Sequence, residues 1–185
     1  PKCPSICNDM AIGPDVSICV SNSAAPHIMR LKPGSTQLEV WVESDVFNQP
    51  KEGAGLDGIA FGSDGNLYLN TYANGEFFRV DVKDGVAGKV TKLKTSRPLK
   101  FPDGLRPVGD QTFIMAEGGG SIDRVTVKGD EVNVDTIKDG LSGPTSVALV
   151  GKTYWAPEGQ LSHLFDAKSG APTLPFRVIG TPAGQ

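Results

Sequence analysis

The chain has 185 residues, of which 38% are hydrophobic, so it can bury one core and is too apolar to be disordered. Its formal net charge of -3 offers no basic field for the phosphates of nucleic acid. No apolar run approaches the roughly 20 residues of a membrane span. We expect one soluble domain, either cytoplasmic or periplasmic/secreted, that binds no nucleic acid. Its 23 glycines and 14 prolines predict many tight turns between short strands.

One pattern of short apolar strands and turns containing Gly or Asn occurs four times along the chain. In the first copy, approximately 1–48, strands are predicted near residues 10–12, 17–20, 27–31 and 38–42. In the second copy, 49–99, they are predicted at 59–61, 67–72, 77–82 and 90–93, separated by Ser-Asp-Gly-Asn and Ala-Asn-Gly turns. The third copy, 100–141, has the same order, and the fourth, 142–185, opens in the same way.

The copies align on a turn position held by Asp15, Asp64, Asp110 and Lys152. The alignment makes four positions equivalent, seven residues before the turn: Asn8, Asp57, Asp103 and Thr145. A period of about 40 to 50 residues with four short strands per copy is typical of a β-propeller blade. The sequence therefore predicts an all-β propeller, in which the four equivalent side chains converge at one mouth of the central channel.

Two features favour a partial six-bladed propeller, with about four blades in this chain, over a closed ring of four. The first copy starts abruptly at its inner strand, and the segment PTLPFRVIG at 172–180 reads as a strand without sheet partners in its own blade. Unpaired edges of this kind are normally covered. We expect N-terminal blades outside this sequence, or another chain, to complete the single domain.

A cation site is predicted where the equivalent residues meet. Asn8, Asp57 and Asp103 would supply amide and carboxylate oxygens, which suit calcium, with zinc, manganese or magnesium as alternatives. The neighbouring Asp9 should point to the other side of its strand. The alternative interpretation is that Asp-Gly and Asn-Asp pairs merely form turns. The hairpin turns already have their own aspartates, Asp15, Asp64 and Asp110, so turn formation does not explain Asp57 and Asp103. This favours the cation site.

Three further residues are candidates for substrate binding near the same mouth, together with Asn8. Glu117 and Glu158 end the second strands of the third and fourth copies, each just before a glycine, and Arg106 follows Asp103. The alternative is that all three are ordinary surface charges. The N-terminal cysteines also leave two possibilities open, because Cys3 and Cys7 can form a bridge or stay as free thiols.

Four stretches carry a resemblance to a known family: CNDMAIGPD, GLDGIAFGSDGNLYLNTY, FPDGLRP and GPTSVALVGKTYWAPEGQL. In this order they resemble the later blades of six-bladed propellers of the gluconolactonase, regucalcin and luciferin-regenerating-enzyme family. The resemblance implies a divalent cation at the channel mouth and the opening of sugar or other lactones. It places Asp103 at the metal-binding aspartate proposed as general base, Asp57 at a metal position usually held by Asn, and Asn8 near metal and substrate. The family's first-blade glutamate ligand has no counterpart in this sequence.

The expected chemistry is therefore hydrolysis of a small-molecule lactone, with a cation polarising the carbonyl group and Asp103 taking a proton from water. Two other functions remain open, because a propeller does not determine its function. One is a non-catalytic propeller that binds a ligand or partner. The other is a strictosidine-synthase-like propeller, whose chemistry needs no such metal ligands.

Overall fold

The computed structural model describes residues 5–184, and within them almost all regular structure is β. The exceptions are one short helix, α1 (Ser162–Phe165), and two 3-10 turns, η1 (Asp45–Phe47) and η2 (Ala167–Ser169). No helix among the described residues has the length and apolar character needed to cross a membrane. The all-β prediction is confirmed.

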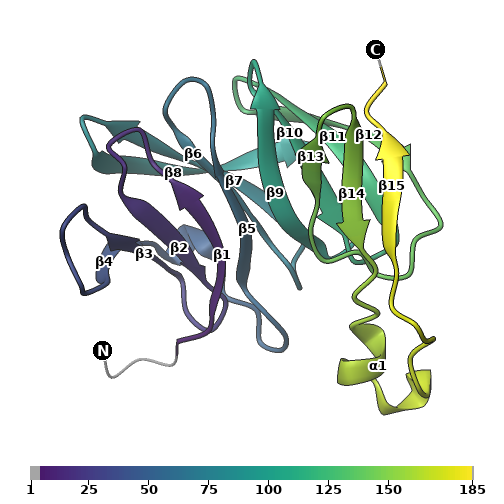
Figure 1. The fold of residues 1–185 in the computed structure, drawn as a ribbon. Helices are drawn as coiled ribbons and strands as arrows, with labels where there is room; N and C mark the ends of the chain where they lie inside the picture. Colours follow the sequence, from purple (N-terminus) through teal and green to yellow (C-terminus); the bar gives the residue numbers. More distant parts are fainter. Residues whose placement is uncertain (1–4, 185) are drawn as a thin grey trace.

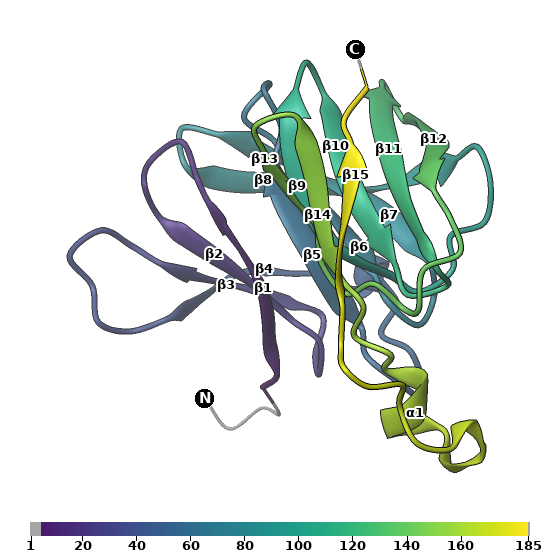
Figure 2. The same cartoon turned by 45° about the vertical axis from the view of Figure 1, so that its right-hand side comes forward.

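The strands form successive antiparallel groups that we call blades 1 to 4, which follow one another along the chain in Figures 1 and 2. Blades 1 and 2 each have four strands, hydrogen-bonded in chain order: β1 (Cys7–Ile12), β2 (Ile18–Asn22), β3 (His27–Leu31) and β4 (Glu39–Glu43), then β5 (Leu56–Phe61), β6 (Leu67–Thr71), β7 (Glu76–Lys83) and β8 (Val86–Thr95). Blade 3 repeats this order with β9 (Pro102–Gly109), β10 (Thr112–Glu117), β11 (Ser121–Lys128) and β12 (Glu131–Lys138). Blade 4 comprises β13 (Ala148–Val150), β14 (Thr153–Pro157) and β15 (Val178–Pro182).

The turns between the first two strands of blades 1 and 2 are built by the aspartates predicted for that role. The Asp15 carboxylate accepts the backbone N–H of Ser17 at 3.1 Å, and Asp64 accepts that of Asn66 at 3.0 Å. Gly65, beside Asp64, has a φ of +79°, which a side chain would disfavour. In blades 1 and 2, local side-chain hydrogen bonds therefore form the turn that connects the inner strand to the second strand.

Two features of the sheets differ from the sequence prediction. The segment 172–180 is not an unpartnered strand, because its end belongs to β15, which pairs with β14 from Thr153↔Pro182 to Pro157↔Val178. Blades 2 and 3 are also not separate sheets. Their outer strands β8 and β12 pair in parallel at Lys94↔Glu131 and Thr95↔Val132, which joins the two blades into one eight-stranded sheet.

Buried apolar side chains fill the space between each pair of neighbouring blades. The cluster between blades 1 and 2 includes Ile28 and Ile59, and the cluster between blades 2 and 3 includes Phe77 and Phe113. A smaller cluster around Tyr154 joins blades 3 and 4. Inner strand β1 packs against β5, and β5 packs against β9. This stacking brings the starts of the three inner strands together. Of the cysteines, Cys7 and Cys19 are free thiols and Cys3 lies outside the described residues.

Candidate functional site

Each of the first three inner strands carries the same β-bulge near its start. In blade 1, Asn8 and Asp9 lie between the pairs Cys7↔Asn22 and Met10↔Val20, so two residues oppose the single residue Ser21. The same irregularity places Asp57-Gly58 opposite one residue of β6, and Asp103-Gly104 opposite one residue of β10. A bulge re-aims the side chain it carries, and bulges are common beside active sites. Asn8, Asp57 and Asp103 therefore have the same position, as the first residue of a two-residue bulge.

Buried polar side chains hold the first two bulges to the next blade. In blade 1, the Ser21 hydroxyl accepts the N–H of Asp9 at 3.1 Å and donates to the carbonyl oxygen of Asp57 at 2.6 Å. In blade 2, Asn70 accepts the N–H of Gly58 at 3.0 Å and donates to the carbonyl oxygen of Asp103 at 2.8 Å. Each bulge is therefore positioned by its own blade and by its neighbour.

The glycine after Asp57 is required by this close approach of the inner strands. A Cβ atom at Gly58 would collide with the carbonyl oxygen of Asp103 and would lie 2.9 Å from the backbone nitrogen of Leu105. Gly104 has a similar position, because a Cβ atom there would lie 2.9 Å from the hydroxyl of Ser146 in the next blade. The Asp-Gly pairs thus combine an inward carboxylate with room for the adjacent strand.

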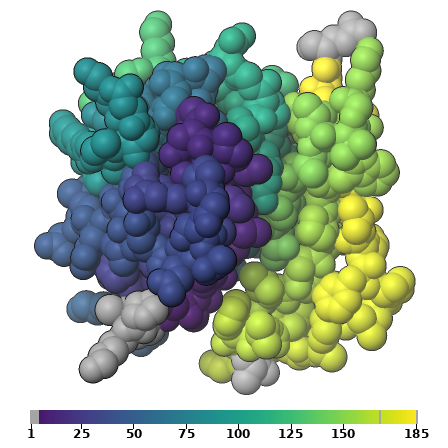
Figure 3. Space-filling model, turned by 60° about the vertical axis from the view of Figure 1, so that its left-hand side comes forward, coloured from purple at the N-terminus to yellow at the C-terminus, as the bar shows by residue number. Residues whose placement is uncertain are grey.

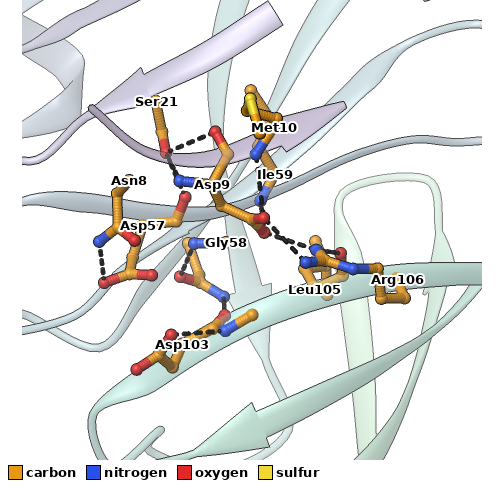
Figure 4. A network of polar contacts seen from close by, with 12 residues as sticks. Asn8, Asp9, Met10, Ser21, Asp57, Gly58, Ile59, Asp103, Leu105 and Arg106 are labelled. Carbon is orange, nitrogen blue, oxygen red and sulfur yellow. Dashed lines mark hydrogen bonds and ion pairs between the residues drawn. The ribbon is translucent and has the colours of Figure 1, made fainter. Parts of the chain in front are cut away.

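The structure brings Asn8, Asp57 and Asp103 together, and Figure 4 shows the carboxyl groups of Asp57 and Asp103 next to each other. Asn8 donates its amide N–H to Asp57 Oδ2 at 2.9 Å and to the Ser23 hydroxyl at 2.9 Å. It therefore presents a donor to the carboxyl pair, where an oxygen ligand was expected. Asp103 accepts the N–H of Gly104 at 2.9 Å. Asp57 Oδ1 is buried and has no hydrogen-bond donor among the described residues.

Burial and mutual repulsion raise the pKa values of both carboxyl groups. Asp57 is 3% exposed, and desolvation together with the charge of Asp103 raises its pKa to about 9. Burial raises the pKa of Asp103 to about 6, against the opposing effect of its hydrogen bonds with Asp57 and with the N–H of Gly104. Burial and the proximity of two like charges therefore favour retention of a proton by the pair.

Asp9 and Arg106 form a separate contact away from the pair. Figure 4 shows Asp9 directed away from Asp57, toward Arg106. The guanidinium group donates to both carboxylate oxygens, at 2.6 and 2.9 Å, and the N–H of Ile59 donates to one of them at 3.2 Å. Arg106 therefore links blades 1, 2 and 3, and its assignment to substrate binding stays a prediction without a supporting contact.

Glu117 and Glu158 have equivalent structural roles in blades 3 and 4. Glu117, 1% exposed, accepts the N–H of Lys100 at 2.6 Å and forms an ion pair with Arg97 at 2.8 Å. Glu158 accepts the N–H of Ser142 at 2.8 Å and pairs with Arg177 at 2.7 Å. Burial raises the pKa of Glu117, whereas the Ser142 hydrogen bond lowers that of Glu158. Both carboxylates hold the loop before an inner strand, and neither lines the cavity.

A cavity of about 1320 Å³ opens over the carboxyl pair. Asn8, Asp57 and Asp103 lie in its wall, together with Tyr72 and the α1 segment. Figure 1 places α1 at the end of the molecule where β1 and β9 begin. Figure 3 shows the first blade (purple to blue) on one side of a face and the last (green to yellow) on the other.

Sequence reasoning did not identify the residues that orient the pair. Ser21 and Asn70 lie one strand away from the aspartates, and Tyr72 follows β6. Burial and the charges of Asp103 and Asp57 raise the pKa of Tyr72, so its hydroxyl belongs to the same electrostatic environment. The signal in the sequence is that the second strands of the first two copies carry polar residues, Ser21 and Asn70, among apolar neighbours.

The described residues contain no group of three or more His, Cys, Asp and Glu side chains placed to hold a metal ion. Two adjacent buried carboxyl groups with raised pKa values nevertheless fit a hard cation, since a cation can replace a proton between them. Asn8 can add its amide oxygen if its side chain rotates about the last torsion.

No family model matches the sequence, and no curated protein matches it either. Among solved structures, the chain is similar to a virginiamycin B lyase from Staphylococcus aureus, with a TM-score of 0.63 and 18% identity over 82% of this chain and 48% of the lyase. It is similar to a gluconolactonase from Xanthomonas campestris, with a TM-score of 0.63 and 16% identity over 81% of this chain and 53% of that protein. It is also similar to a luciferin-regenerating enzyme, with a TM-score of 0.72 and 18% identity over 96% of this chain and 61% of the enzyme.

The chain thus spans about half the length of the first of these proteins, 48% of the lyase. At 14–18% identity the likeness extends to the fold alone, and structures described as a nutrient-binding protein and an allergen share it. The chain has the β-propeller fold that its repeats predict.

Proposed function

We propose that the chain carries the reactive centre of a metal-dependent lactone hydrolase, in which Asp57 and Asp103 hold a divalent cation, calcium first, and Asp103 acts as general base. One observation carries this proposal. Two buried carboxyl groups from neighbouring blades lie side by side, with raised pKa values, in the wall of an open cavity. Such pairs are uncommon outside functional sites, because each carboxylate destabilises the other.

The two aspartates differ in ways that suit different roles. Burial raises the pKa of Asp103 to about 6 in the chain without metal, and a bound cation would lower it, so the base would be ionised at neutral pH. Asp57 is held by the Asn8 amide and is the more strongly perturbed of the two, which suits a group that binds a cation or a proton. Asn70 donates to the carbonyl oxygen of Asp103 and thereby fixes the backbone from which the base extends.

A bound divalent cation would supply polarisation of the lactone carbonyl group and stabilise negative charge on its oxygen. Asp103 would take a proton from the water molecule that attacks the carbonyl carbon. Asp57, Asp103 and the Asn8 oxygen would hold the cation. The carboxyl of Asp57 must lose its proton for this, so cation binding is favoured as pH rises.

The test compares lactone hydrolysis by the wild-type chain and by Asp103→Asn, with calcium supplied or removed by EDTA. Asp110→Asn is the matched control, because Asp110 is an exposed turn residue in the same blade. A general base contributes about 10²–10⁴-fold in rate, so we expect a loss of that size in Asp103→Asn alone. Hydrolysis that survives in Asp103→Asn, or that is indifferent to EDTA, contradicts the proposal and favours a binding propeller.

A further inference from the structure

Phe101 has a backbone conformation that a bulky residue rarely adopts. It lies two residues before Asp103, its φ is +56°, and it is 51% exposed. A large side chain in this left-handed region is strained, and such strain persists where the surrounding structure enforces it. An exposed phenyl ring does little for the core, so the strain needs another explanation.

Blade 4 shows that the fold does not require a side chain at this position. The residue equivalent to Phe101 is Gly143, with a φ of +59°. The two loops share their backbone contacts, since Gly118 donates to Phe101 O at 2.7 Å and Gly159 donates to Gly143 O at 2.9 Å. The equivalent residues of blades 1 and 2, Ile6 and Gly55, do not have a positive φ. Of the two loops that use the left-handed conformation, blade 4 has a glycine and blade 3 has a phenylalanine.

The strained phenyl ring stands next to a second aromatic ring in the cavity wall. Tyr72 and Phe101 lie with ring centroids 5.4 Å apart and ring planes tilted by 37°, and both line the cavity. Gly118 makes room for them, because a Cβ atom there would lie 3.2 Å from the Tyr72 hydroxyl and 3.2 Å from Phe101 Cβ. Asp57 and Asp103 line the same cavity as the ring pair, and burial together with their charges raises the pKa of the Tyr72 hydroxyl.

The charges around the cavity restrict what this pair can bind. The described residues that line it include no lysine or arginine, whereas Glu52, Asp57, Asp103 and Asp166 are all acidic. No lysine or arginine of this lining is therefore available to pair with an anionic group of a substrate. The Phe101 ring offers no hydrogen-bond partner to the hydroxyl groups of a sugar, whereas it matches the surface of an apolar group.

We propose that Tyr72 and Phe101 form a platform for the apolar part of the substrate, so that the site takes uncharged lactones bearing an aryl ring or alkyl chain in preference to aldonolactones. This specificity rests on the proposed hydrolase function. The ring pair would hold an aryl group by offset or edge-to-face contacts. The lactone carbonyl would then lie toward the carboxyl pair, which belongs to the neighbouring wall of the same cavity.

The test measures kcat/KM for dihydrocoumarin and for D-glucono-δ-lactone in the full chain with calcium. We expect at least a tenfold preference for dihydrocoumarin. Phe101→Gly should reduce kcat/KM for dihydrocoumarin about tenfold, with little effect on the sugar lactone, since an aromatic contact contributes about that factor. Phe176→Ala is the matched control, because Phe176 is 56% exposed and does not line the cavity. Phe101→Gly should keep or raise the melting temperature, because glycine relieves the strain.

A binding measurement separates this inference from the proposed function. In Asp103→Asn, which should not turn over substrate, saturation-transfer NMR is used to detect dihydrocoumarin on the protein. Binding that disappears in Asp103→Asn/Phe101→Gly supports the platform, even if the wild-type chain hydrolyses neither lactone, in which case only the hydrolase proposal fails. Binding that persists in the double variant overturns the platform. A wild-type preference for D-glucono-δ-lactone also overturns it.

Discussion

Replacing Asp57 with asparagine should remove most of the pH dependence of stability near neutral pH. The folded chain without metal holds a proton on Asp57 up to a pKa of about 9, whereas an aspartate in the unfolded chain ionises near its usual 3.8. Between these values the folded state binds the extra proton, so the free energy of unfolding falls as pH rises. Asparagine has the shape of the protonated side chain and does not titrate.

The expected size follows from the linkage relation. Each pH unit inside that window costs about 1.4 kcal/mol for one differential proton. Above pH 6.5, Asp103 contributes little, because its folded pKa is about 6. From pH 6.5 to 8.5 the wild-type chain should therefore lose about 3 kcal/mol as the carboxyl pair gives up its proton. Asp57 is 3% exposed, so solvent screening reduces this value only slightly.

The assay is urea denaturation in EDTA at pH 6.5, 7.5 and 8.5, with Asp110→Asn as the matched control for loss of one carboxyl group. The difference in free energy of unfolding between Asp57→Asn and wild type should shift in favour of the variant by about 3 kcal/mol over this range. Asp110→Asn should follow the wild-type slope. Parallel curves for wild type and Asp57→Asn would refute the shared proton and, with it, the electrostatic basis of the cation site.

Two other predictions address the cation and the loop before β9. Calcium at a hundredfold excess over its dissociation constant should stabilise the fold by about 2.7 kcal/mol. Asp103→Ala should abolish this gain and Asp64→Ala should retain it in thermal denaturation with and without calcium; a gain that survives in Asp103→Ala places the ion elsewhere. Glu117→Ala should cost about 2 kcal/mol in urea denaturation, because the N–H of Lys100 loses its acceptor while Arg97 keeps its ion pair with Asp123. A cost below about 1 kcal/mol would show that Glu117 does not hold this loop.

The sequence was sufficient for the strands and for the convergence of the site, because both follow from local rules repeated four times. The turn aspartates at 15 and 64 set the hairpins, and the alternation of apolar residues set the strand positions. Given a propeller, equivalent residues of successive blades must face a common axis. Asn8, Asp57 and Asp103 meet for that reason.

Other features depend on contacts between distant segments, which periodicity does not encode. The sequence suggests that Glu117 binds substrate or is a surface charge, because its partner Arg97 lies 20 residues earlier in the chain. The parallel pairing of β8 with β12 needs the packing of two whole blades. The direction of the Asn8 amide depends on the Ser23 hydroxyl and on the protonation of Asp57, so the residue type alone suggested an oxygen ligand where the structure places a donor.

The parallel join between β8 and β12 affects how the molecule opens. Neighbouring blades of a propeller ordinarily meet through side chains, so that each can fluctuate by itself. Here backbone hydrogen bonds, such as that from the N–H of Lys94 to the carbonyl oxygen of Asp130 at 2.9 Å, connect the rims of blades 2 and 3. Amide protons from β5 to β12 should therefore exchange as one cooperative unit, while blades 1 and 4 open at lower free energy. Since Asp57 and Asp103 both belong to that unit, the carboxyl pair should stay assembled while the rest of the cavity wall opens.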